Sequence, residues 1–189
     1  ANRLGTNSLL DLVVFGRRSG LAMAKFCHET DLGPVPPNPT AEVAAEFERL
    51  LVSDKGEPAA RLRDELQDIM MDNVGIFREG PGIQVAVDKV KELKERYKTV
   101  VVMDKGKRFN TDLLEAWELK NLLDLAQVTA VSALNRTESR GAHLREDFPK
   151  RDDVEWLKHT LVSLDSNDDV SIDYKPVTIT KFQPKERVY

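Results

Sequence analysis

The first ten residues carry the side chains best suited to bind a negatively charged group. The planar guanidinium of Arg3 could hold a carboxylate through two charge-assisted hydrogen bonds. The Asn7-Ser8 pair is typical of a helix start, with Ser8 as N-cap and Asp11 completing a capping box three residues on. A helix start leaves backbone N–H groups without partners at the positive end of the helix dipole, which suits an anion. Taken alone, the same residues also fit a solvated surface arginine and an ordinary helix cap.

A second polar group follows a long helical pattern and consists of Arg136, Glu138, Arg140 and His143. Read from the residues, it is a helix terminus with its salt bridges, and we assign none of its members a catalytic role. We expect His143 to be a hydrogen-bonded structural imidazole rather than a proton carrier.

The sequence contains no complete active site. It has no G-x-G-x-x-G, no Walker loop and no G-x-S-x-G. Cys27 and His28 are adjacent, while His143 and His159 stand apart, so no metal-ligand spacing is present. Cys27, the single cysteine, allows no disulfide within the chain and is expected to be a half-buried thiol near a helix end.

Composition narrows the class of protein. The 189 residues are 41% hydrophobic and 32% charged, which is ordinary for a globular protein. A net charge of -4 argues against nucleic acid as a partner, since tracking phosphates needs a basic excess. No apolar run approaches the roughly 20 residues of a membrane span, so any membrane association is expected to be indirect.

The elements that must position these residues are mostly helical. A helix from Ser8 to about His28 begins with apolar Leu9, Leu10 and Val13, which are expected to be buried against a larger body. "DLGPVPPNPT" then predicts an extended linker. Four further helices are expected, namely from Thr40 as cap to Leu51, from Pro58 to Arg78, from Ile83 to Tyr97, and a long one capped by Asn110 or Thr111. The last three predict an antiparallel bundle, and "HTLVSL" and "VSIDY" predict a terminal β-hairpin.

Two stretches resemble one known family. "ANRLGTNSLLDLVVFGRRSG" and "RTESRGAHLREDFPKRDDVEWLKHTL" are similar to segments of the flavoprotein subunit of succinate dehydrogenase and its fumarate reductase relatives. "RDELQDIMMDNVGIFR", "FNTDLLEAWEL" and the terminal "KERVY" fall in the same order as that family's helical and tail segments. Five matches in collinear order identify the chain as similar to the family's C-terminal portion.

The resemblance implies a mainly α fold, in which an antiparallel bundle of three long helices precedes a small β-hairpin tail and follows a helix of a truncated FAD-binding domain. The implied ranges are 1–33 for the FAD-domain remnant, 34–40 for the linker, 41–140 for the bundle and 141–189 for the C-terminal extension. The polar group around Glu138 would then pack the bundle against the flavin domain and an iron–sulfur partner.

For function, the resemblance implies a parent enzyme that oxidises succinate to fumarate by hydride transfer to covalent FAD. Arg3 matches the family arginine that holds the dicarboxylate substrate, and Ser8 and Leu9 match positions that meet the flavin. An iron–sulfur subunit and membrane anchor subunits are the implied partners. The implied location is the cytoplasmic face of a bacterial inner membrane, or the matrix side in a mitochondrion.

Several alternatives remain open at this stage. Fumarate reductase shares the same motifs and runs the reaction backwards, and L-aspartate oxidase is a more distant relative. A helical-bundle interaction domain without a redox role is the non-enzymatic alternative. The chain by itself is expected to be inactive and to expose Leu9, Leu10 and Val13 as an apolar patch prone to self-association.

Overall fold

The computed structural model describes residues 7–165 and 167–185. The chain divides into two compact units, Ala1–Glu42 and Val43–Tyr189. In the first unit, α1 (Asn7–Glu29) is a single helix followed by extended chain. Its apolar side chains are exposed, with Leu9 at 66%, Leu10 at 62% and Val13 at 72%. The expected exposed patch is therefore present on α1, and Cys27 is exposed rather than half-buried.

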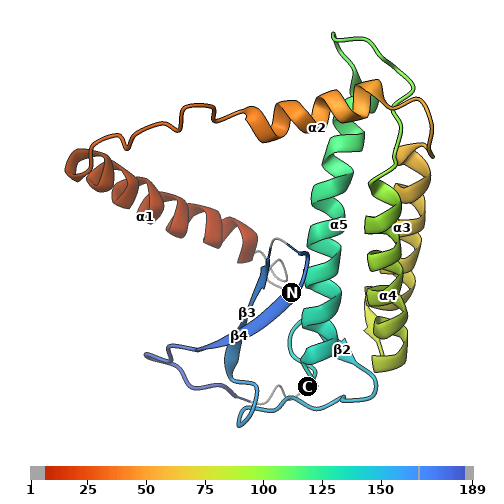
Figure 1. Ribbon diagram of the computed structural model, residues 1–189. Helices are drawn as coiled ribbons and strands as arrows, with labels where there is room; N and C mark the ends of the chain where they lie inside the picture. Colours follow the sequence, from red (N-terminus) through yellow and green to blue (C-terminus); the bar gives the residue numbers. More distant parts are fainter. Residues whose placement is uncertain (1–6, 166, 186–189) are drawn as a thin grey trace. The chain divides into compact units, whose positions relative to one another are not determined.

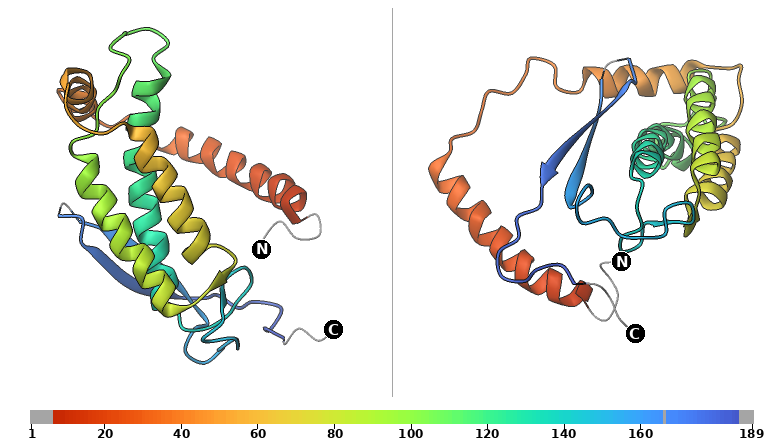
Figure 2. Two further views of the ribbon diagram at one scale, coloured as in Figure 1. Left: turned by 90° about the vertical axis from the view of Figure 1, so that its right-hand side faces the viewer. Right: turned by 90° about the horizontal axis from the view of Figure 1, so that it is seen from below.

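The second unit is built on three long helices. They are α3 (Ala59–Val74), α4 (Gly80–Tyr97) and α5 (Thr111–Asn135), and α2 (Ala41–Val52) adds a shorter one. Figures 1 and 2 show α3, α4 and α5 side by side with successive helices antiparallel. The expected mainly α fold with a helical bundle is confirmed.

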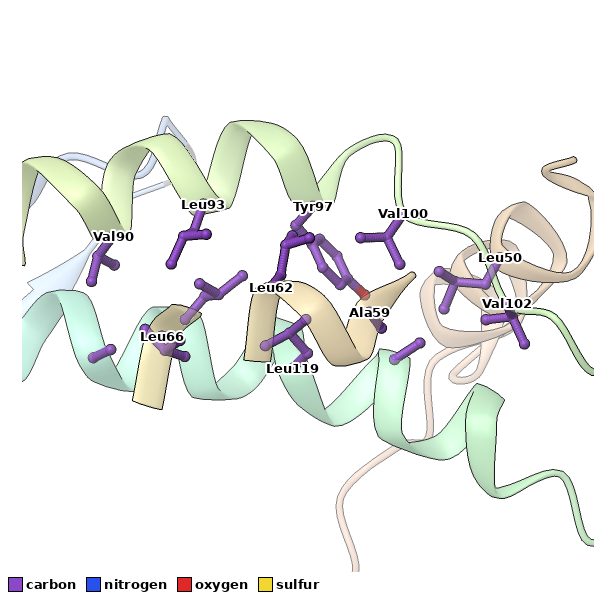
Figure 3. Packing of buried hydrophobic residues seen from close by; sticks show 13 residues of the cluster. Leu50, Ala59, Leu62, Leu66, Val90, Leu93, Tyr97, Val100, Val102 and Leu119 are labelled. Atoms are coloured by element: carbon purple, nitrogen blue, oxygen red, sulfur yellow. The ribbon is translucent and has the colours of Figure 1, made fainter. Parts of the chain in front are cut away.

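A continuous apolar core holds the bundle together. Leu62 of α3, Leu93 of α4 and Leu119 of α5 are fully buried and point toward one another (Figure 3). Leu50 of α2 joins the same cluster. Each such leucine contributes about 1.5–3 kcal/mol through burial, so packing between the helices is the main source of their stability.

Two of the expected helix boundaries were wrong. The helix α3 ends at Val74 rather than Arg78, because Gly75 follows it as C-cap and the chain then turns into a short strand. The next helix begins at Gly80 rather than Ile83. Pro81 lies in its first turn, where a proline costs no hydrogen bond, so "GPG" starts this helix instead of separating two.

The longest helix has the predicted start. The side chain of Asn110 accepts a hydrogen bond from the backbone N–H of Leu113 at 2.8 Å, which makes it the N-cap. The helix ends at Asn135, so the residues from Arg136 to Arg140 are not helical.

Two pairs of strands complete the described chain. β1 (Phe77–Arg78) pairs in parallel with β2 (Leu144–Arg145), which joins the end of α3 to the segment after α5. β3 (Lys158–Leu164) and β4 (Val170–Pro176) form the antiparallel hairpin that the sequence predicted, and in its register Leu161 faces Asp173. Among the described helices, none combines the length and the apolar character needed to cross a membrane. The four domain ranges stay a prediction.

Candidate functional sites

Of the three predicted site residues, two lie in the described part of the chain. Arg3 lies outside it. Ser8 and Leu9 occupy the first turn of α1. Ser8 is not the N-cap that the sequence suggested, because the helix already begins at Asn7 and Ser8 has entered it.

The first turn of α1 carries the two residues that the sequence assigned to a flavin cofactor. The backbone N–H groups of Ser8 and Leu9 belong to the first turn, where no carbonyl of the helix itself can accept from them. Exposed Leu9, Leu10 and Val13 follow within two turns. First-turn N–H groups beside apolar surface are the donors that a planar ring with negative charge at one edge would require. The roles of Arg3, Ser8 and Leu9 stay a prediction.

The second polar group is assembled around Glu138, whose side chain is 0% exposed. Its carboxylate accepts hydrogen bonds from Arg136 and from Arg140 Nε at 2.8 Å. The backbone N–H of Asp152 donates to it as well, at 2.9 Å. Burial alone would raise the pKa of Glu138, but these bonds outweigh it and the pKa is lowered. Glu138 is therefore a paired anion that ties two arginines to the loop that follows them.

Arg136 and Arg140 each donate further hydrogen bonds besides those to Glu138. Arg136 also donates to the carbonyl oxygens of Trp156 and Lys158 at the start of β3. Arg140 also donates to Asp153 at 2.8 Å. The expected salt bridges at the end of the helix are present, and they reach the base of the hairpin.

Arg145 is a fully buried cation beside this group, 2% exposed. Its Nη1 donates to the carbonyl oxygens of Ala133 and Leu134 in the last turn of α5, at 2.8 and 3.0 Å. Its other edge makes a two-pronged pair with Asp147 at 2.7 and 2.8 Å. Arg145 thus satisfies helix-end carbonyls that would otherwise be unpaired.

His143 has both ring nitrogens occupied, as expected for a structural imidazole. Nδ1 accepts from Arg78 Nη1 at 2.9 Å, since a guanidinium can only donate, and Nε2 then donates to the Arg136 carbonyl oxygen at 3.0 Å. Burial lowers the pKa of His143, and the charges of nearby arginines lower it further. The imidazole is neutral and fixed in orientation.

Sequence reasoning missed Arg78, Arg145 and Asp147 as members of this group. They lie in "NVGIFR" and "REDFPKRDD", which are parts of the stretches quoted above for the family resemblance, but their hydrogen-bond partners are up to 67 residues away along the chain. Within residues 7–165 and 167–185, no group of acidic, cysteine and histidine side chains could hold a metal ion. In the described chain, Glu138 and Asp147 are each paired with arginines, and the second polar group ties the segment after α5 to the end of α3 and to the hairpin.

Comparison with known proteins shows which family this chain is similar to. The family model described as fumarate reductase flavoprotein C-term matches residues 63–189. The whole chain is 46% identical to the fumarate reductase flavoprotein subunit of Haemophilus influenzae, of which it covers 32%. It is 42% identical over its whole length to the succinate dehydrogenase flavoprotein subunit of Rickettsia bellii, covering 33% of that protein.

Solved structures give the same result. A variant of the E. coli quinol fumarate reductase matches 99% of this chain and 33% of its own with a TM-score of 0.91 and 41% identity. The Mycobacterium smegmatis Sdh1 complex matches 96% of this chain and 31% of its own, with a TM-score of 0.81 and 35% identity. The chain spans about a third of the length of these relatives. The resemblance read from the sequence is confirmed, and so is a flavin cofactor at the level of the family.

Proposed function

Because the chain belongs to the fumarate reductase flavoprotein C-terminal family, we propose that it is the C-terminal third of a flavoprotein subunit that oxidises succinate to fumarate. The observation that carries the proposal is similarity along the whole chain to subunits with the succinate dehydrogenase and fumarate reductase names. The 46% identical relative is a fumarate reductase, which favours fumarate reduction as the second candidate.

Arg3 is the residue of this chain that we assign to the substrate. A dicarboxylate must be held rigidly for its C–H bond to reach the acceptor, because small errors in position cost large factors in rate. An arginine holds one carboxylate in two bonds and stays charged at any working pH.

We assign Ser8 and Leu9 to the cofactor. FAD supplies the hydride acceptor when it is bound. The first-turn N–H groups of α1 would donate to the edge of the ring system that carries negative charge in the reduced state, and Leu9 would cover its apolar neighbour. This sequence lacks a G-x-G-x-x-G motif, so the isolated chain is proposed to retain no FAD and to be inactive.

The assembled protein is proposed to pass electrons to an iron–sulfur subunit and to sit peripherally on membrane anchor subunits. The proposed location is the cytoplasmic face of a bacterial inner membrane, or the matrix side in a mitochondrion. The solved relatives include a quinol fumarate reductase, which is consistent with an assembly of this kind.

The test uses a full-length flavoprotein subunit that ends in this chain. Arg3→Gln should lower succinate-dependent dye reduction by about 10²-fold or more, since the substrate loses its anchor. Arg3→Lys should recover part of the loss because it restores the charge without the planar fork. Comparing forward and reverse rates in the parent protein assigns the direction.

Arg17→Gln is the matched control, because Arg17 is an exposed arginine of α1. Its activity should equal that of the parent. If Arg3→Gln retains full activity with an unchanged KM for succinate, the assignment of Arg3 is wrong.

A further inference from the structure

Arg78 differs from the other arginines that surround His143. Arg136 is paired with Glu138, and Arg145 is paired with Asp147. Arg78 has no carboxylate within salt-bridge distance in the parts of the chain that the structure describes. Burial lowers the pKa of Arg78, so its charge is partly removed from water without a compensating anion.

One end of the Arg78 side chain is used by the fold. Its Nε donates to the carbonyl oxygens of Val74 and Gly75 at 3.0 and 2.8 Å, which satisfies the end of α3. Its Nη1 donates to His143. Its Nη2 has no hydrogen-bond partner among the described residues. The bonds to the end of α3 and to His143 therefore account for Nε and Nη1, whereas no bond in the described chain accounts for Nη2.

Arg78 is one of the residues that line a groove of about 430 Å³ between α5 and β3. The groove has an apolar wall made by Val128, Ala133 and Val162. Hydroxyl groups of Thr129 and Thr160 line it as well. None of the lining residues in the described chain is acidic, and Arg136, the second arginine that lines the groove, is already paired with Glu138. The cation of Arg78, two hydroxyl donors and an apolar wall are the features that a small carboxylate requires.

The hydroxyls are positioned to donate. Thr160 Oγ1 accepts a hydrogen bond from Arg136 Nη2 at 3.2 Å, so its own hydrogen can point into the groove. Thr129 is exposed on α5, and its side chain has no hydrogen-bond partner in the described chain. His143, whose Nδ1 is an acceptor, faces Arg78 and keeps its guanidinium oriented.

We propose that the groove between α5 and β3 binds a short-chain monocarboxylate, with the carboxylate on Arg78 and the hydrocarbon part against Val128 and Val162. A carboxylate side chain of another protein segment offers the same headgroup chemistry. The apolar wall distinguishes the two sources, because contact with it would increase the affinity for a free ligand that carries a hydrocarbon chain.

The test titrates this chain with acetate and with butyrate while the backbone and imidazole NMR signals are followed. We expect saturable shifts confined to Arg78, His143 and the facing residues of α5 and β3. Butyrate should bind about tenfold more tightly than acetate, because it has two more methylenes and each buried methylene adds about 0.8 kcal/mol. Sodium chloride at the same ionic strength should not reproduce the shifts. Acetate and butyrate binding equally would assign the groove to a carboxylate side chain and overturn the free-ligand proposal.

Arg78→Gln should weaken butyrate binding at least tenfold, and Arg78→Lys should weaken it less because the charge remains. Arg61→Gln is the matched control, since Arg61 is an exposed arginine at the other end of α3 and should leave binding unchanged. Arg3→Gln should also leave it unchanged, which separates this groove from the proposed substrate arginine.

Should Arg78→Gln fail to fold, Thr160→Val tests the same groove without touching the end of α3. It should weaken butyrate binding and leave the helix intact. The proposal is overturned if no saturable shift occurs, or if the Arg78 and Thr160 variants bind butyrate as well as the parent chain.

Discussion

Glu138 illustrates what a single buried charge does for this protein. It has no exposed surface, and two arginines and a backbone N–H share its carboxylate. Replacing one member of a buried ion pair leaves the other members uncompensated, and typically costs about 3–5 kcal/mol. Glu138→Gln should therefore lower the free energy of unfolding by about 3 kcal/mol, measured by urea denaturation.

Glu155→Gln is the control for that substitution, because Glu155 is exposed and is not a partner in any described salt bridge. Its stability should lie within about 0.5 kcal/mol of the parent. Equal stability of the Glu138 and Glu155 variants would mean that the arginines find water or other partners when Glu138 is lost.

The ionisation of Asp147 makes the free energy of unfolding depend on pH. Arg145 holds the pKa of Asp147 at about 2, below its ordinary 3.8. A carboxyl whose folded pKa is lowered stabilises the fold fully above its unfolded pKa, and the stabilisation disappears as the pH falls through the folded value. The free energy of unfolding should thus decrease between about pH 4 and pH 2, and Asp147→Asn should flatten that part of the curve. A profile unchanged by the substitution would show that Arg145 is neutralised by other groups.

At the element scale, the β3–β4 hairpin is fastened at its tip as well as at its base. Lys94 of α4 has a side chain only 11% exposed and pairs with Asp124 of α5 at 2.7 Å. It also pairs with Asp168 in the turn between the strands, at 2.8 Å. Gln127 Nε2 donates to the Asp168 carbonyl oxygen at 3.0 Å. Asp168 adopts a positive φ of 64°, and these contacts hold it in that uncommon conformation.

Lys94→Met should loosen this tip while the bundle stays folded. Methionine keeps most of the side-chain volume and removes the cation that joins the turn to α4 and α5. We expect faster amide hydrogen exchange in the turn from Asp165 to Asp169 and unchanged exchange at the base of the hairpin. Lys91→Met, an exposed substitution on the same helix, serves as the control. Identical exchange in the two variants would mean that strand pairing alone fixes the turn.

At the scale of the whole molecule, α1 is a long helix whose apolar side chains are exposed to solvent. Large apolar side chains along it are more than half exposed, including Leu9, Leu10 and Val13. Contiguous apolar surface of this kind drives association in water. The chain should therefore show a light-scattering mass that rises with concentration above the monomer value of 21.3 kDa.

Leu9→Gln combined with Val13→Gln should keep the chain monomeric over the same concentrations. Leu125→Gln removes an equally exposed leucine from α5 and should not change the association. A monodisperse monomer for the parent chain at high concentration would contradict the prediction.

Much of this protein was determined by its sequence because the signals are local. Asn110 caps its helix three residues from its partner, and the alternation in "HTLVSL" and "VSIDY" predicts the hairpin within one short stretch. The quoted motifs identified the family, since similarity of this kind depends on residue order alone. The boundaries at Arg78 and Ile83 were wrong because a glycine after one helix and a proline in the first turn of the next both look, along the sequence, like a break between helices.

Only the tertiary structure decided how the charges are paired. Arg145 looks like one of many charged residues in "HLREDFPKRDD", yet it is buried at the end of α5. Arg78 lies in strand contact with a segment more than 60 residues away, and no local pattern shows that it lines a groove whose described residues include no carboxylate. Helix periods and caps depend on neighbours along the chain, whereas the environment of a charge depends on which remote segments the packing brings beside it.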